Sequence, residues 1–200
     1  MTQHLFLLRH GEVTSHRGDV PVTEEGLRTA VEVGRRLAGR ADGAIRVISG
    51  ETRRTRDTAA AVARGAREAG AEVREDGVAF ALRNPDLYLA GVRVDMVSSE
   101  EAFAAQVPGF TEADVAKVAF FTEWLTAPDR VGWWVRHPEP PGDREDDTAF
   151  TVAVTHSPVL RACGLDVAGG DIGEPAWLAG LEAEIGTDRS VTLRLLPEAP

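Results

Sequence analysis

The chain has 200 residues, of which 43% are hydrophobic, and it carries 32 acidic against 22 basic residues. This length and apolar content fit one globular domain, spanning residues 1–200, with a core of its own. The net charge of −10 argues against nucleic acid and anionic membrane surfaces as partners.

The N-terminus and the single cysteine indicate where the protein works. The first residues, MTQHLFLLRHGE, lack the basic segment and the long apolar run of a signal peptide. No stretch reaches the ~18 apolar residues that a membrane-spanning helix needs. Cys163 has no second cysteine to pair with, which fits a reducing compartment. We therefore expect a cytoplasmic protein without membrane contact; its oligomeric state is open.

The first half of the chain alternates between strand and helix patterns. Residues 3–9 form an apolar run without helical period, which predicts a buried strand. A helix is expected from the N-cap Thr23 to Gly39, because two glutamates fill its first turn and an apolar stripe follows. The sequence then predicts a strand at 45–49, an alanine-rich helix within 51–70 and a strand within 71–82.

The second half is less regular before the alternation returns. Residues 83–110 contain helix and strand breakers, and 111–127 read as a helix. Residues 128–148 hold four prolines together with Trp133 and Trp134, and we expect a long loop that either covers a pocket or packs on the body.

The last quarter predicts a strand, a short helix and a hairpin. Residues 149–156 form the strand. The helix follows with Ser157 as N-cap, Pro158 at its first position and Gly164 at its end. Residues 181–196 form the hairpin. Strands alternating with helices predict an α/β fold, a three-layer α/β/α sandwich around a mostly parallel sheet.

Charged residues stand directly after three of the expected strands. His10 follows the first strand, His156 ends the strand at 149–156, and Arg53 and Arg54 lie in the first turn of the helix after 45–49. Ligands of open parallel sheets bind beyond the carboxyl ends of the strands. If the three strands are neighbours, these side chains surround one cationic pocket on an acidic protein. A compact dianion such as phosphate is its natural ligand, since arginine binds two phosphate oxygens at once and the helix beginning at Ser157 adds its positive end.

Four segments in order resemble the motifs of the histidine phosphatase superfamily, which includes the cofactor-dependent phosphoglycerate mutases. They are RHGE at 9–12, DVPVTEEG at 19–26, SGETRRTRDTA at 49–59 and VTHS at 154–157. The resemblance implies the phosphoglycerate mutase-like form of the α/β sandwich.

The resemblance also implies roles for individual residues. His10 would be the nucleophile that forms a phosphohistidine, which water then hydrolyses. Arg9, Arg54 and His156 would bind the phosphoryl oxygens, while His16 stands where many relatives have an asparagine that touches this group. No cofactor is implied. The five histidines have no metal-ligand spacing, so we expect no metal.

The general acid that protonates the leaving group does not follow the family pattern. Many relatives have an L-x-E segment where this chain has Leu82-Arg83-Asn84, and another branch has an aspartate where Ser157 stands. Asp86 is the predicted replacement, with Glu100 and Glu101 as alternatives.

The expected activity is hydrolysis of a small phosphomonoester through a phosphohistidine on His10. A protein phosphohistidine phosphatase and a non-catalytic phosphate-binding module are the alternatives, since both tolerate the missing acid. A mutase is disfavoured, because the E-R-x-Y-G segment of the phosphoglycerate mutases is absent. The expected partner is a small phosphorylated substrate.

Overall fold

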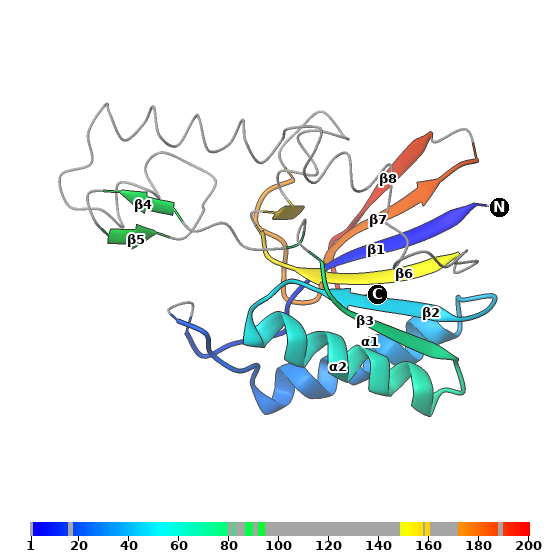
Figure 1. Cartoon of the computed structure of the whole chain (residues 1–200), viewed down its shortest axis with the longest axis horizontal. Coiled ribbons are helices and arrows are strands. Elements are labelled where there is room, and N and C mark those ends of the chain that lie inside the picture. The colour runs from blue at the N-terminus through cyan, green and yellow to red at the C-terminus, as the bar shows by residue number, and fades with distance from the viewer. Residues whose placement is uncertain are drawn as a thin grey trace.

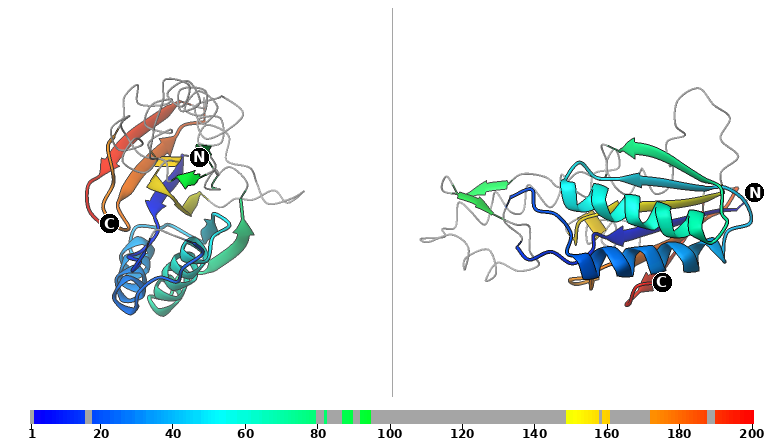
Figure 2. Two further views of the ribbon diagram at one scale, coloured as in Figure 1. Left: turned by 90° about the vertical axis from the view of Figure 1, so that its left-hand side faces the viewer. Right: turned by 90° about the horizontal axis from the view of Figure 1, so that it is seen from below.

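A six-stranded sheet with two helices against one face forms the body of the protein (Figures 1 and 2). The structure is a computed structural model and describes residues 2–15, 18–79, 82, 87–89, 92–94, 149–157, 159–160, 172–187 and 190–200. Its elements are β1 Gln3–Arg9, α1 Glu24–Ala38, β2 Ile45–Ser49, α2 Arg53–Glu68, β3 Val73–Val78, β4 Leu87–Leu89, β5 Val92–Val94, β6 Phe150–Thr155, β7 Gly180–Ile185 and β8 Val191–Leu196.

The strand order is β3-β2-β6-β1-β7-β8. The first four of these strands are parallel; β7 pairs antiparallel with β1, and β8 pairs antiparallel with β7. β6 lies between β1 and β2, with Thr155 opposite Arg9 on one side and Val154 opposite Ser49 on the other. The predicted α/β class is confirmed, with an antiparallel pair added at one edge. The carboxyl ends of β1, β2 and β6 therefore meet at one end of the sheet.

Side chains of the central strands alternate between two apolar clusters, as the pleat of a strand requires. Along β1, Phe6 and Leu8 belong to the cluster shared with the helices, whereas Leu5 and Leu7 belong to the cluster on the other face. Val159 and Leu160 join this second cluster. The helix expected at 111–127 lies outside the described residues.

The two helices have the ends that the sequence predicts. Thr23 caps α1, because its side chain accepts a hydrogen bond from the Gly26 N–H at 3.0 Å, and the helix ends before Gly39. α1 and α2 cross with their backbones in contact. A Cβ on Gly34 would lie 2.0 Å from the Val62 carbonyl oxygen, so no other residue fits there without movement.

The second half of the chain agrees with the predictions in part. The strand at 149–156 and the hairpin within 181–196 are present as β6, β7 and β8. β4 and β5 form a small antiparallel pair inside the segment 83–110, whose breakers made it look less regular in the sequence. The expected loop at 128–148 lies outside the described residues. Among the described helices, none has the length and apolar character needed to cross a membrane.

The predicted start of the short helix after β6 is wrong by one residue. Ser157 is already helical, and the carbonyl oxygen of His156 accepts hydrogen bonds from the N–H groups of Val159 and Leu160. His156 therefore stands at the N-cap position. The Ser157 hydroxyl instead donates a hydrogen bond to Glu174, seventeen residues further along the chain.

Candidate active site

His10 and His156 face each other at the carboxyl ends of β1 and β6. Their ring centroids are 5.4 Å apart with the ring planes inclined at 66°, and the residues are only 3% and 2% exposed. The backbone N–H of His10 donates to the Thr155 carbonyl at 3.0 Å, which continues the β1–β6 ladder past the end of β1. Parallel pairing of the two strands is thus what brings together histidines that are 146 positions apart in the sequence.

The His10 ring is held by its Nδ1 atom, which lies 2.8 Å from the carbonyl oxygen of Gly11. A carbonyl oxygen only accepts hydrogen bonds, so Nδ1 must carry the hydrogen in this contact. In the neutral ring the lone pair is then on Nε2. This is the tautomer that a nucleophilic imidazole needs.

Two buried arginines stand beside the histidines. Arg9 is 8% exposed and Arg54 is 5% exposed, and Arg54 Nη1 donates to the Gly18 carbonyl at 3.1 Å. Burial lowers the pKa of the Arg9 guanidinium; the Glu174 carboxylate raises it and the positive charge of Arg54 lowers it. The two guanidinium groups therefore lie close enough to repel each other. A shared anion would relieve that repulsion.

Arg9 also has a buried donor with no acceptor in the described part of the chain, its Nε atom. A buried N–H without a partner costs about 1 to 3 kcal/mol, more when the group is charged. An oxygen of a bound anion would remove this cost. The donor chemistry at this end of the sheet is thus suited to phosphate.

Thr58 connects the loop of the nucleophile to the helix that carries Arg54. Its Oγ1 atom accepts a hydrogen bond from the Gly11 N–H at 2.9 Å and donates one to the Arg54 carbonyl at 2.7 Å. A second link comes from Asp19, whose Oδ1 atom accepts from the backbone N–H of Arg53 at 2.5 Å. These hydrogen bonds hold the segments at 9–12, 19–26 and 49–59 to one another beside the two histidines.

The segment before β7 contributes two site residues that the sequence analysis missed. The ring centroids of Trp177 and His10 are 5.2 Å apart, and the guanidinium carbon of Arg9 lies 3.9 Å from the Trp177 ring centroid. Glu174 binds Arg9 through Oε1, 2.8 Å from Nη2, and accepts the Ser157 hydroxyl through Oε2. The sequence signal was weak: a tryptophan and a glutamate near a proline, in a segment with no motif.

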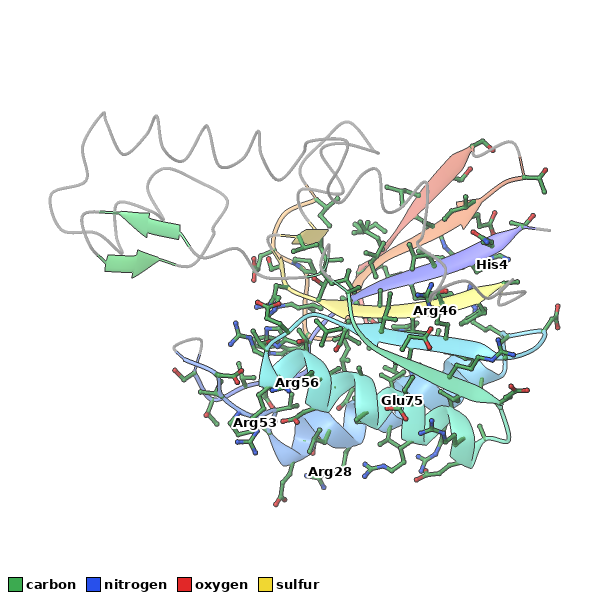
Figure 3. The ribbon with its side chains drawn as sticks, in the orientation of Figure 1. His4, Arg28, Arg46, Arg53, Arg56 and Glu75 are labelled. Atoms are coloured by element: carbon green, nitrogen blue, oxygen red, sulfur yellow. The ribbon has the colours of Figure 1, made fainter. Side chains whose placement is uncertain are left out.

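The other residues that the sequence suggested either lie outside the described part of the chain or are exposed. His16, Asp86, Glu100 and Glu101 lie outside the described residues. Arg53 and Arg56 are exposed on α2 (Figure 3), whereas Arg54 is buried, so Arg53 does not join the expected pocket. Glu12 is exposed and accepts a hydrogen bond from the Thr23 hydroxyl at 3.0 Å, so it sets the loop.

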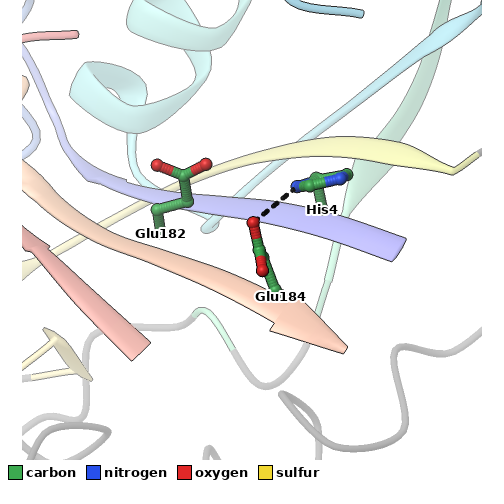
Figure 4. Close-up of side chains that lie close together, drawn as sticks. All are labelled: His4, Glu182 and Glu184. Atoms are coloured by element: carbon green, nitrogen blue, oxygen red, sulfur yellow. Dashed lines mark ion pairs between the residues drawn. The ribbon is translucent and has the colours of Figure 1, made fainter. Parts of the chain in front are cut away.

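His4, Glu182 and Glu184 form a group at the other end of β1 whose ligand atoms lie within 4.8 Å of one another (Figure 4). Both carboxylate oxygens of Glu182 are already bound by arginines, Oε1 by Arg40 at 2.5 Å and Oε2 by Arg194. We interpret this group as an ion-pair network and not as a metal centre, since a metal would have to displace two cations.

A family model, the histidine phosphatase superfamily (branch 1), matches residues 5–76 of the chain. No curated protein sequence matches this chain. The matched segment contains three of the four motifs and both candidate arginines.

Solved structures share the fold over nearly the whole chain. A mycobacterial glucosyl-3-phosphoglycerate phosphatase is 20% identical with a TM-score of 0.55, covering 98% of this chain and 97% of that one. Phosphoserine phosphatase from Entamoeba histolytica, solved with 3-phosphoglyceric acid, is 14% identical with a TM-score of 0.56, covering 96% and 94%. A presumed phosphohistidine phosphatase, SixA, from Nakamurella multipartitia is 18% identical with a TM-score of 0.50, covering 100% and 97%.

These matches confirm the resemblance to the histidine phosphatase superfamily. The chain shares the fold of these solved structures, and His10 and His156 meet at the carboxyl ends of β1 and β6.

Proposed function

We propose that this protein is a phosphatase that hydrolyses a small phosphomonoester through a phosphohistidine on His10. The observation that carries the proposal is the pair of facing imidazole rings, one of them fixed through Nδ1 to a carbonyl oxygen. A buried imidazole with its lone pair on Nε2, beside two buried guanidinium groups, is suited to attack a phosphorus atom and to bind the charged oxygens around it.

The reaction has two steps. In the first, Nε2 of His10 attacks phosphorus, the bond to the leaving oxygen breaks, and that oxygen takes up a proton to leave as an alcohol. In the second, water attacks the phosphohistidine, the N–P bond breaks and phosphate departs. Arg9, Arg54 and His156 bind the oxygens whose charge changes in both steps. Asp86 as the proton donor is still a prediction from the sequence, since it lies outside the described residues.

The neighbouring structures support a small phosphorylated substrate, because two of them are described as phosphatases of glucosyl-3-phosphoglycerate and of phosphoserine. A protein phosphohistidine is the second candidate. This candidate is favoured because the glutamate of the L-x-E segment is absent, and the imidazole of a phosphohistidine leaves phosphorus without strong assistance from an acid. The likeness to the SixA structure also favours it.

Comparing a set of sugar and amino-acid phosphates with a phosphohistidine protein decides between the two substrates. Turnover of the small esters with no dephosphorylation of the protein rules out the second candidate. Binding of vanadate together with no turnover of any ester would instead indicate a non-catalytic phosphate-binding module.

The experiment that tests the proposal is the substitution His10→Ala with p-nitrophenyl phosphate as substrate. We expect a loss of at least about 10³-fold in kcat/KM, because the nucleophile is removed. The wild-type protein quenched during turnover should carry an acid-labile phosphoryl group on His10. His4→Ala is the matched control, since His4 lies at the opposite end of the same strand. Substantial activity in His10→Ala would refute the proposed nucleophile.

A further inference from the structure

The proposed reaction needs a proton for the leaving oxygen. In the described part of the chain, Glu12, Glu51 and Glu174 lie near the site residues in sequence or in space and are the candidate proton donors. Glu12 is exposed and bound to Thr23. Glu51 is the sequence neighbour of Thr52, whose hydroxyl lies 3.4 Å from His156 Nε2. The Oε2 atom of Glu51 is buried and has no hydrogen-bond partner in the described part of the chain. Glu174 binds two residues of the site, Arg9 and Ser157.

We propose that Glu174 is the general acid of this protein, giving its proton to the leaving oxygen of the substrate; this inference rests on the proposed phosphatase function. One carboxylate oxygen binds the phosphate-site residue Arg9 at 2.8 Å, and the other binds the hydroxyl of the residue that follows His156. The carboxyl group is thus anchored by Arg9 at the end of β1 and by Ser157 in the helix after β6, and each anchor is the sequence neighbour of one site histidine.

The position of Glu174 suits a group that meets the leaving oxygen. His10, His156, Arg9 and Arg54 are between 2% and 8% exposed, so a phosphoryl group among them lies deep, with the nucleophile beside it. In-line attack directs the leaving group away from the nucleophile, and the remainder of a substrate needs room toward solvent. The Glu174 side chain is 51% exposed and stands at this rim, next to the buried Arg9.

Binding of a phosphomonoester dianion changes the charge balance around Glu174. Without ligand, its carboxylate is a counter-ion of Arg9, which also feels the positive charge of Arg54. A phosphomonoester dianion would replace it as the partner of both guanidinium groups. Two arginines, a dianion and an ionised Glu174 sum to a net charge of −1, whereas a protonated Glu174 makes the sum zero. The proposed reaction thus places a neutral carboxyl group, and not a further anion, beside the leaving oxygen of the bound dianion.

The proton balance closes over the cycle. As the N–P bond forms and the ester O–P bond breaks, the carboxyl O–H of Glu174 passes its proton to the ester oxygen, which leaves as the alcohol. In the second step the Glu174 carboxylate takes a proton from the attacking water while the N–P bond breaks. His10 is then neutral again. As phosphate leaves, Glu174 releases the proton that it took up with the substrate, and its carboxylate pairs with Arg9 again.

The test is Glu174→Gln assayed with a series of esters that differ only in their leaving group. General acid catalysis contributes about 10² to 10⁴-fold and matters most for poor leaving groups. We expect a loss of about 10²-fold or more in kcat with an alkyl phosphate, and of less than about fivefold with 2,4-dinitrophenyl phosphate, whose leaving group needs no proton. Glu174→Asp should restore part of the alkyl phosphate activity.

The competing explanations are separated by parallel variants. Equal losses across the whole series would overturn the proposal, since they mean that Glu174 only orients Arg9. A leaving-group dependence in Glu51→Gln or Asp86→Asn, absent in Glu174→Gln, would assign the acid to that residue. Glu184→Gln, an exposed carboxylate at the far end of β7, should change nothing. If wild type hydrolyses no ester of the series, it is the proposed function that fails; if it does, the series tests Glu174 alone.

Discussion

Thr58 shows how one hydroxyl group can support the candidate site from behind. It is fully buried and joins the Gly11 N–H to the Arg54 carbonyl. Thr58→Val keeps the shape of the side chain but leaves both backbone groups without this partner, so we expect a loss of about 2 kcal/mol in the free energy of unfolding. Thr58→Ser keeps the hydroxyl and should lose less than half as much. Urea unfolding of the two variants measures the difference, and equal stability would show that these bonds contribute nothing.

The residues that the sequence could predict for the site are those carried by short motifs at strand ends. His10, Arg9, Arg54 and His156 each stand where an apolar run stops or a helix begins, and the structure brings them together. Glu174 could not be found this way. Its contact with Arg9 joins positions 165 residues apart, in a segment without periodicity, and depends on how the chain returns to the sheet before β7.

At the scale of elements, the crossing of α1 and α2 depends on two glycines. A Cβ on Gly34 would meet the Val62 carbonyl at 2.0 Å, and one on Gly65 would meet the Val31 carbonyl at 1.9 Å. Because the obstacle is backbone, Gly65→Ala must push the helices apart, and we expect it to cost about 3 kcal/mol, at the upper end for overpacking.

Gly39→Ala is the control for that substitution. Gly39 has a φ of −69°, and its nearest neighbour to a new Cβ is 3.4 Å away. The free energy of unfolding of the Gly39→Ala protein should differ from that of the wild-type protein by less than about 1 kcal/mol. Thermal unfolding of both variants measures this, and a Gly65→Ala protein as stable as Gly39→Ala would contradict the close crossing.

Most described elements could be predicted because each has a strong local pattern. The apolar run of β1, the capped stripe of α1 and the alanine-rich α2 are determined by residues near one another in the chain. The start of the helix after β6 was misjudged for the opposite reason. The Ser157 hydroxyl, which resembles a helix cap in sequence, is engaged by a carboxylate from another segment.

At the scale of the whole molecule, ligand binding should stabilise the fold. A ligand that binds only the folded state at a hundred times its Kd adds about 2.7 kcal/mol of stability. For a chain of this length that corresponds to a rise of about 5 to 10 °C in Tm. We expect this rise with vanadate for the wild-type protein and for Arg53→Ala, whose side chain is exposed on α2.

Arg54→Ala should lose most of the rise in Tm at the same vanadate concentration, since it removes one of the two buried guanidinium groups. Differential scanning calorimetry gives the three curves. A full rise in Arg54→Ala, or none in the wild-type protein, would show that the anion binds elsewhere or not at all.

The place of β6 in the sheet has a consequence for how the protein is made. β1 and β2 do not pair with each other; the strand between them is built from residues 150–155. A ribosome therefore completes three quarters of the polypeptide before the sheet can close. Until then, the backbone N–H and C=O groups of β1 and β2 that pair with β6 have no strand partner. The region matched by the family model, although it holds most of the motifs, lacks the strand that would let it fold as an independent unit.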